Sequence, residues 1–560
     1  MGPALPGKAD YTAHGTGTDA EEGVLMPRLR AILLLLVVLL PACGQMTARV
    51  EETPQPTFPP TTQPRSTTAP ATAVPPTSTV SQQTQTPAPA TSSASTTAPA
   101  PSATTPAPSA TTPADTITQD SLGDPYYPQL GNGGYDVAHY NIDLAVDVER
   151  NVVSGTTTIA ARAVEELPAF NLDWEGPESS GVTVDGVPAQ TSTRNGELAI
   201  TPAATIPAST IFTTTVAYRG TPDLVRSPAV STPLGWTRHE DGIYVVSEPS
   251  GAQGWFPAND HPRDKATYSF RITVPEPWIV AANGLLRDMI DQGTTTTFVW
   301  ETTRPMASYL ATVNIGDFVI MEETEPGGLA VRNYFPRSIA QSAAPVFAPT
   351  VDMIGYFEQV FGPYPFEAYG VVVPDQELGF ALETQTLSVF GRDIATARPE
   401  RVEGIVAHEL AHQWFGNSVS VYNWEDIWLS EGFATLGEWL WLEHRGGKEA
   451  ADEAIRATYA YFLRRSTPPP GRPPATDLFN QGVYGRGGLT LAALRLEVGD
   501  ERFFQILRTY SERYRYGNAS TADFVAVAEE VGGVELDTFF QGWLYEPELP
   551  SIPALRLAPP

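Results

Sequence analysis

The sequence is poor in cysteine and in basic residues. Its 560 residues include one cysteine, Cys43, so no disulfide can form within the chain. An exported domain of this composition depends on its hydrophobic core alone. Against 64 Asp and Glu stand 34 Lys and Arg, which gives a formal net charge of −30. Nucleic-acid binding needs clusters of Lys and Arg, so this composition argues against nucleic acid as a partner.

Long apolar runs are also lacking. The run at residues 32–40 is too short for a membrane span, which takes about 20 residues. It follows Arg28 and Arg30 and ends in Leu-Pro-Ala-Cys, as a secretory signal that starts at Met26 would. This ending resembles a bacterial lipobox cleaved before Cys43. We therefore predict a lipoprotein signal peptide at residues 26–42, and a leading segment, 1–25, that is either not translated or unstructured.

The lipobox predicts that Cys43 carries a lipid. A buried structural cysteine is the alternative, but Cys43 lies outside any core-forming pattern. Residues 43–122 continue in Thr, Pro, Ala and Ser with few large apolar side chains, and such a tract cannot bury a core. We expect a disordered stalk that reaches on the order of 200 Å. The membrane is thus a predicted partner, through an anchor at the extracytoplasmic face of the cell.

Strand patterns dominate residues 123–328. Apolar side chains alternate strictly at Tyr140, Ile142, Leu144, Val146 and Val148, and again at Tyr268, Phe270, Ile272 and Val274. Alternation of this kind is typical of half-buried strands. Pro and Gly are frequent between these segments. The pattern predicts an antiparallel β domain.

Residues 399–431 contain the strongest chemical motif, His408-Glu409-Leu410-Ala411-His412. Pro399 suits a first helical position, and Val402, Val406 and Leu410 form an apolar stripe, so a helix is expected. Two histidines four residues apart lie on one helix face and can bind one metal ion. Glu409 can then reach a water on that metal.

Glu431 is the predicted third ligand. It lies near the start of a second helical pattern, at about residues 426–444, beyond a Gly416-Asn417 stop signal. Two His and one Glu leave the fourth position of a tetrahedral zinc open for water, as catalytic sites do. The five-residue motif alone is short, and chance matches on amphipathic helices occur.

The flanking residues make the motif specific. Trp414-Phe415-Gly416-Asn417 follows the second histidine, and residues 428–434 read WLSEGFA. The sequence thereby resembles the aminopeptidase N family of gluzincin metallopeptidases over about residues 126–547. Ser430 departs from the family's usual Asn. The resemblance implies an α+β multidomain fold: an antiparallel β-saddle at 123–328, then a thermolysin-like, mainly helical catalytic domain at 329–560, with one Zn²⁺ per chain.

The resemblance also assigns further site residues. Residues 255–260 with Lys265 are similar to the family's WFPCFDEPxxKAT stretch, and nine residues before Pro257 stands Glu248. By the same resemblance, Glu248 and Glu383 bind the free α-amine of the substrate. Glu383 lies in the segment 379–385, where Phe380, Leu382 and Thr384 depart from the family pattern. Tyr484, in a VYGRG segment similar to VYxKG, stabilises the oxyanion.

These residues predict a zinc-dependent aminopeptidase at the cell surface. In this interpretation zinc polarises the scissile carbonyl, Glu409 is the general base and Tyr484 donates to the oxyanion. The substrates are peptides with a free N-terminus. Two alternatives remain open: a zinc endopeptidase or other gluzincin hydrolase that uses the same site, and an inactive surface binding protein on the same fold.

Overall fold

The computed structural model describes residues 121–559. The predicted leading segment 1–25, the signal peptide 26–42, the lipidation site Cys43 and nearly all of the stalk 43–122 lie outside the described residues. Within the described part, no helix is both long enough and apolar enough to cross a membrane.

The first two hundred described residues form strands. In chain order these are β1 (Tyr135–Asp147), β2 (Val152–Ala163), β3 (Phe170–Asp173), β4 (Ser179–Val184), β5 (Val187–Pro188), β6 (Gln190–Arg194), β7 (Glu197–Thr201), β8 (Ile211–Gly220), β9 (Gly235–His239), β10 (Gly242–Val246), β11 (Thr267–Pro275), β12 (Ile279–Ala282), β13 (Leu285–Asp291), β14 (Thr295–Glu301), β15 (Val313–Gly316) and β16 (Phe318–Thr324). Short 3₁₀ turns, η1 (Ala252–Gly254) and η2 (Ser308–Leu310), interrupt them.

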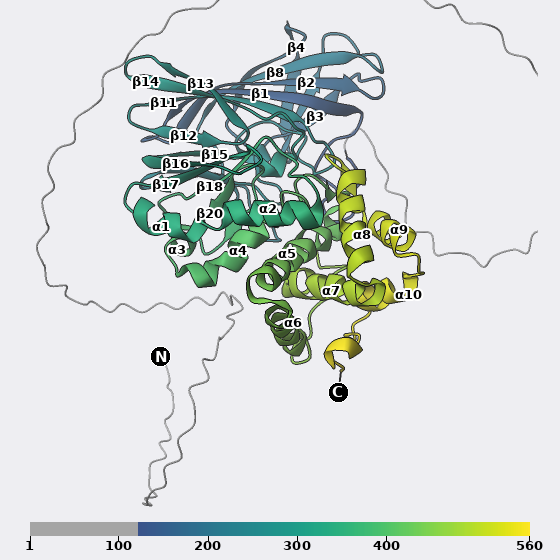
Figure 1. The fold of residues 1–560 in the computed structure, drawn as a ribbon. Coiled ribbons are helices and arrows are strands. Elements are labelled where there is room, and N and C mark those ends of the chain that lie inside the picture. Colours follow the sequence, from purple (N-terminus) through teal and green to yellow (C-terminus); the bar gives the residue numbers. More distant parts are fainter. Residues whose placement is uncertain (1–120, 560) are drawn as a thin grey trace, which may run out of the picture. The chain divides into compact units, whose positions relative to one another are not determined.

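The largest sheet has eight strands in the order β13-β14-β11-β1-β2-β8-β4-β5. The alternation predicted from the sequence is present: Tyr140, Ile142 and Leu144 of β1 are buried while their neighbours are partly exposed. A four-stranded sheet, β12-β15-β10-β9, and a three-stranded sheet, β3-β7-β6, complete this half. Figure 1 shows these strands, in blue and teal, stacked above the helices.

The β domain is antiparallel as expected, except at one pair of strands. β1 runs parallel to β11, with His139 opposite Thr267 and Ala145 opposite Thr273. Parallel neighbours need a long crossover connection, and the chain supplies one, because β2 to β10 intervene between the two strands. Alternation within one strand reveals its buried face but carries no information about the direction of its partner.

The second half is mainly helical. Its strands are β17 (Ala330–Pro336), β18 (Ala368–Val372), β19 (Ala381–Leu382), β20 (Ser388–Phe390), β21 (Ser420–Val421) and β22 (Asn518–Ala519). Its helices are α1 (Ala340–Phe347), α2 (Thr350–Phe361), α3 (Arg392–Ala395), α4 (Pro399–Ala411), α5 (Trp428–Gly446), α6 (Lys448–Phe462), α7 (Gly487–Val498), α8 (Asp500–Arg513), α9 (Thr521–Gly532) and α10 (Asp537–Phe540). Short helical turns are η3 (Trp424–Asp426), η4 (Gly482–Arg486), η5 (Gln541–Tyr545) and η6 (Pro553–Leu555).

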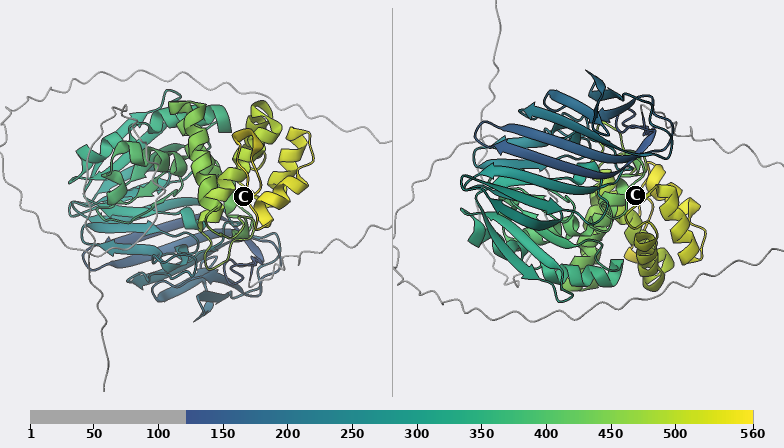
Figure 2. Two further views of the ribbon diagram at one scale, coloured as in Figure 1. Left: turned by 90° about the horizontal axis from the view of Figure 1, so that it is seen from below. Right: turned by 90° about the horizontal axis from the view of Figure 1, so that it is seen from above.

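A five-stranded sheet, β16-β17-β18-β20-β19, joins the two halves. The predicted boundary between residues 328 and 329 falls in the turn of the β16–β17 hairpin, so β16 shares a sheet with strands that precede the zinc motif. Figure 2 shows the blue strands and the green to yellow helices on different sides of the molecule.

Lys265 ties the β half to the loop that follows α4. Its Nζ donates to the carbonyl oxygens of Asn417 at 2.8 Å, Ser418 at 3.0 Å and Gly517 at 3.3 Å. Burial lowers the pKa of Lys265 to about 7. Three backbone carbonyls satisfy the three donors of an ammonium group. This contact fixes residues 417 and 418 directly behind the motif helix.

Candidate metal centre

Helix α4 carries three of the predicted site residues. Pro399 occupies its first turn, and Val402, Val406 and Leu410 are buried on the face that packs into the core. His408 and Glu409 lie in the last turn, and His412 is the residue that caps the helix. The two imidazole rings are 4.8 Å apart between centroids, as expected for positions four apart on one face.

Helix α5 supplies the third member from its first turn. The Oε2 atom of Glu431 lies 3.3 Å from Nε2 of His408 and 3.6 Å from Nε2 of His412. All three side chains are buried, with 11%, 2% and 3% of the side chain exposed for His408, His412 and Glu431. One donor atom from each lies within 4.8 Å of the other two. The structure thus brings the predicted triad together.

The hydrogen bonds of the two Nδ1 atoms determine which ligand the triad can bind. Nδ1 of His408 lies 2.7 Å from Oε1 of Glu438, and Nδ1 of His412 lies 3.1 Å from the carbonyl oxygen of Phe415. Both partners are acceptors, so each Nδ1 carries the proton and each Nε2 presents a lone pair. Two nitrogen lone pairs and a carboxylate oxygen therefore converge on one point. A zinc ion fits this donor set.

Glu438 was not identified from the sequence. It lies seven residues after Glu431 on α5, which places both carboxylates on one helix face two turns apart. That spacing is a signal the sequence does contain. Hydrogen bonding from a carboxylate fixes the tautomer and orientation of a metal-ligating histidine, so Glu438 positions His408.

Glu409 is buried beside the triad. Burial raises the pKa of Glu409 to about 8, while the nearby His408 and His412 oppose this shift. A carboxylate with a raised pKa can take up a proton and give it back near neutral pH. Its place on α4 next to His408 matches the sequence prediction.

Glu248 and Glu383 come from different halves of the chain. Glu248 follows β10, and Glu383 follows the two-residue strand β19. Both are buried, with 8% and 3% of the residue exposed. Burial raises the pKa of Glu248, and repulsion by Glu383, Glu431 and Glu409 adds to the shift. The structure therefore brings the two predicted amine-binding carboxylates to the same site as the triad.

The main chain of Glu383 is fixed by the motif helix and its loop. Its carbonyl oxygen accepts hydrogen bonds from Nε2 of Gln413 at 3.1 Å and Nδ2 of Asn417 at 2.6 Å. The Oε1 atoms of Glu248 and Glu383, by contrast, are buried and have no hydrogen-bond partner among the described residues. A buried carboxylate oxygen without a hydrogen-bond donor is unfavourable. These two oxygens could therefore bind a cationic or hydrogen-bonding ligand.

Tyr484 lies against the triad. It belongs to the π-helical turn η4, and its ring stacks on that of His408 with centroids 5.9 Å apart and an angle of 23°. Burial raises the pKa of Tyr484 well above its usual range, and the carboxylates of Glu431 and Glu248 raise it further. The hydroxyl thus stays protonated and can donate a hydrogen bond.

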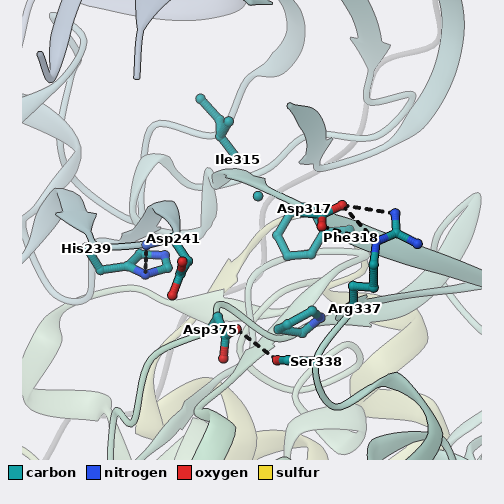
Figure 3. Close-up of a pocket in the computed structure, with 10 residues that line it drawn as sticks. His239, Asp241, Ile315, Asp317, Phe318, Arg337, Ser338 and Asp375 are labelled. Atoms are coloured by element: carbon teal, nitrogen blue, oxygen red, sulfur yellow. Dashed lines mark hydrogen bonds and ion pairs between the residues drawn. The ribbon is translucent and has the colours of Figure 1, made fainter. Parts of the chain in front are cut away.

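A separate pocket of about 130 Å³ lies between the turn after β9 and the start of β16. Figure 3 shows two of its acids in contact with partners: Asp317 with Arg337, and Asp375 with Ser338. None of the predicted site residues lines it.

A two-histidine, one-carboxylate triad with a buried Glu beside it is the arrangement typical of zinc metallopeptidases. Comparison with known families agrees. Residues 137–310 match the Peptidase M1 N-terminal domain, and residues 347–543 match the Peptidase family M1 domain. The chain belongs to peptidase family M1.

Relatives with assigned names are similar in sequence. Human glutamyl aminopeptidase is 28% identical over 53% of this chain, and aminopeptidase N of Streptomyces lividans is 28% identical over 54%. The matched part covers 33% and 38% of these two relatives. The chain therefore spans about a third of the length of the curated relatives it matches.

Solved structures match over more of their length. The M1 zinc metallopeptidase from Deinococcus radiodurans is 31% identical, with a TM-score of 0.72, and the match covers 78% of this chain and 100% of that one. A variant of the same enzyme bound to a Tyr-Ser-Ala substrate is 30% identical at a TM-score of 0.72, over 77% and 99% of the two chains. The match therefore extends over the whole length of the Deinococcus enzyme.

Replacing Glu438 tests the metal centre. We expect Glu438→Ala to weaken zinc affinity by about 10- to 100-fold, because His408 loses the acceptor that fixes its tautomer. The measurement is zinc content by elemental analysis across a chelator titration, in which the wild-type protein should hold one zinc per chain. Glu443→Ala, on the same helix but paired with Arg495, is the control and should match wild type. Equal chelator sensitivity of Glu438→Ala and wild type would contradict the assignment.

Proposed function

We propose that the protein is a zinc aminopeptidase that hydrolyses N-terminal residues from peptides. The observation that carries this proposal is the pair of buried, unpartnered carboxylate oxygens on Glu248 and Glu383 beside the triad. Two acids in one buried site repel each other and favour a cationic guest. The free α-ammonium group of a peptide supplies that charge, whereas an internal peptide bond does not.

Each side chain then has one task. Zinc, when bound by His408, His412 and Glu431, would supply a Lewis acid that polarises the scissile carbonyl and lowers the pKa of water. Glu409 accepts the proton of the attacking water and passes it to the leaving amine. Tyr484 donates its hydroxyl hydrogen to the oxyanion that develops on the carbonyl oxygen.

The comparisons support this proposal. The relatives named above are called aminopeptidases, and structures of a two-domain M1 zinc metallopeptidase variant are described with L-arginine and L-tryptophan bound. Both ligands carry a free α-amine. An endopeptidase with the same triad would have no use for two unpaired carboxylates at this place. An inactive binding protein would have no need to keep Glu409 buried beside an intact triad.

We also propose that the protein is a lipoprotein at the extracytoplasmic face of the cell membrane. The support lies in the sequence: Arg28 and Arg30, the apolar run 32–40 and the lipobox-like ending before Cys43. The proline- and threonine-rich residues that follow would act as a spacer between the lipid and the catalytic part.

If Glu409 is the general base, its replacement should affect turnover but not zinc binding. Glu409→Gln should keep the zinc and lose nearly all activity, because the substitution removes the base and leaves the three ligands in place. Zinc content and hydrolysis of an aminoacyl fluorophore are measured on the same preparation. Glu400→Gln, exposed in the first turn of α4, is the control. Activity near the wild-type level in Glu409→Gln would exclude Glu409 as the base.

The two carboxylates predict dependence on the substrate's amine. Losing one partner of a buried charge-assisted contact costs about 2–5 kcal/mol, so Glu383→Ala should lower kcat/KM for free-amine peptides at least about thirtyfold. Glu248→Ala should behave similarly, and neither change should alter zinc content. The exposed Glu377→Ala is the control.

Acetylated substrates complete the same kinetic series. Wild-type protein should fail to cleave a peptide whose α-amine is acetylated, because an amide carries no charge for Glu248 and Glu383 to bind. Cleavage of acetylated and free peptides at equal rates would favour the endopeptidase instead. Absence of hydrolysis of both by zinc-loaded protein would favour the binding protein.

The lipid anchor predicts membrane partitioning. Expressed from Met26 in a bacterium, the wild-type protein should fractionate with membranes, and Cys43→Ser should not, because the variant lacks the only thiol in the chain. Immunoblots of membrane and soluble fractions make the comparison. The same distribution for both proteins would rule out the anchor.

A further inference from the structure

Arg486 is a buried cation that the proposed mechanism does not use. It lies two residues after Tyr484, at the end of the π-turn η4, and 2% of the residue is exposed. Burying a guanidinium without partners is strongly unfavourable. The residues that satisfy it must therefore matter for the conformation of this turn.

The hydrogen bonds of its side chain go to backbone carbonyls of one C-terminal segment. Nε donates to the oxygen of Trp543 at 2.8 Å, and Nη1 lies 3.4 Å from that of Pro547. Nη2 lies 2.9 Å from the carbonyl oxygen of Gly542, 2.6 Å from that of Glu546 and 3.2 Å from that of Glu548. Five carbonyls, from residues 542 to 548, thus surround one guanidinium.

Helix geometry explains why this segment can receive a cation. Gly542 and Trp543 belong to the π-turn η5, which ends at Tyr545. The last carbonyls of a helical segment have no partners within it and carry the negative end of the helix dipole. The other three acceptors, residues 546–548, lie just beyond this turn. A guanidinium has five N–H donors in a planar fork, whereas an ammonium has three at one point. Arginine, in place of the lysine of the family pattern, therefore suits this arrangement of carbonyls.

The turn that carries Tyr484 is held from the remaining sides by close packing. A Cβ atom added at Gly485 would lie 2.8 Å from Cε2 of Phe462 on α6. One added at Gly487 would lie 3.0 Å from Cα of Gly432, the residue after the ligand Glu431. Close backbone contact with α5 therefore limits how far the turn can move from the triad.

We propose that Arg486 is a positioning residue for Tyr484, and that the C-terminal segment 542–548 is thereby part of the catalytic apparatus. The backbone carbonyls of residues 542–548 bind the guanidinium and thereby fix the end of η4. The position of η4 in turn directs the Tyr484 hydroxyl toward the scissile carbonyl of the substrate. This inference rests on the proposed peptidase function. It gives a role in catalysis to a segment that contains none of the predicted site residues.

A double-mutant cycle in the full chain tests the proposal. Arg486→Lys keeps the charge but cannot reproduce the five contacts, so kcat for a free-amine substrate should fall at least about tenfold, with KM within about twofold and zinc content unchanged. In a Tyr484→Phe background, the same substitution should cost nothing further, because the hydroxyl it positions is gone. Arg495→Lys, on α7 and paired with Glu443 and Asp500, is the control and should have no effect in either background.

A second variant alters the C-terminal segment that binds Arg486. Pro547 is exposed, so Pro547→Gly should fold while it loosens the carbonyls of residues 546–548. We expect a smaller fall in kcat, about threefold, again absent beside Tyr484→Phe. This variant also decides the matter if Arg486→Lys proves insoluble.

Two outcomes would overturn the proposal. The first is that Arg486→Lys lowers kcat by the same factor in the wild-type and Tyr484→Phe backgrounds. A purely structural role of Arg486 would give this result. The other is an unchanged kcat in folded Arg486→Lys or, if that variant is insoluble, in Pro547→Gly. Both outcomes compare kcat of a variant with that of its parent, so both require an active wild-type protein. If the peptidase assignment itself were wrong, the wild-type protein would hydrolyse no free-amine peptide.

Discussion

The site depends on the convergence of unshared electron pairs at one buried point. Nε2 of His408, Nε2 of His412 and Oε2 of Glu431 lie close together there. The Nδ1 atoms of the two histidines bind Glu438 and the Phe415 carbonyl, so both Nε2 atoms face Glu431. Without a cation this arrangement would be strongly unfavourable in a buried site. Zinc binding and the packing of α4 on α5 are therefore energetically linked.

The same principle extends beyond the triad. Glu248, Glu383 and Glu409 add further negative charge in a region shielded from water, and each raises the cost of leaving the others ionised. A metal ion would offset part of this charge, and in the proposed function the ammonium group of a substrate would offset the rest. That function would link substrate selection to the metal centre.

The surrounding contacts explain how such a site keeps its geometry. Lys265 from the β half binds the loop after α4, and Asn417 of that loop binds the backbone of Glu383. Arg486 joins the turn of Tyr484 to the C-terminal segment. Both basic side chains bind backbone carbonyls, so they fix chain segments rather than neutralise acids. Long-range ties of this kind hold site residues from distant parts of the chain together.

The sequence by itself determined the metal-binding motif, because its residues are local: His408, Glu409 and His412 occupy one helix whose spacing dictates their alignment. It also determined the helix that carries Glu431 and the buried faces of β1 and β11. Only the tertiary structure decided that β1 and β11 run parallel, that Glu438 holds His408, and that Glu248 meets Glu383. These facts depend on pairings between segments far apart in the chain, and a local pattern specifies which face is buried but not what packs against it.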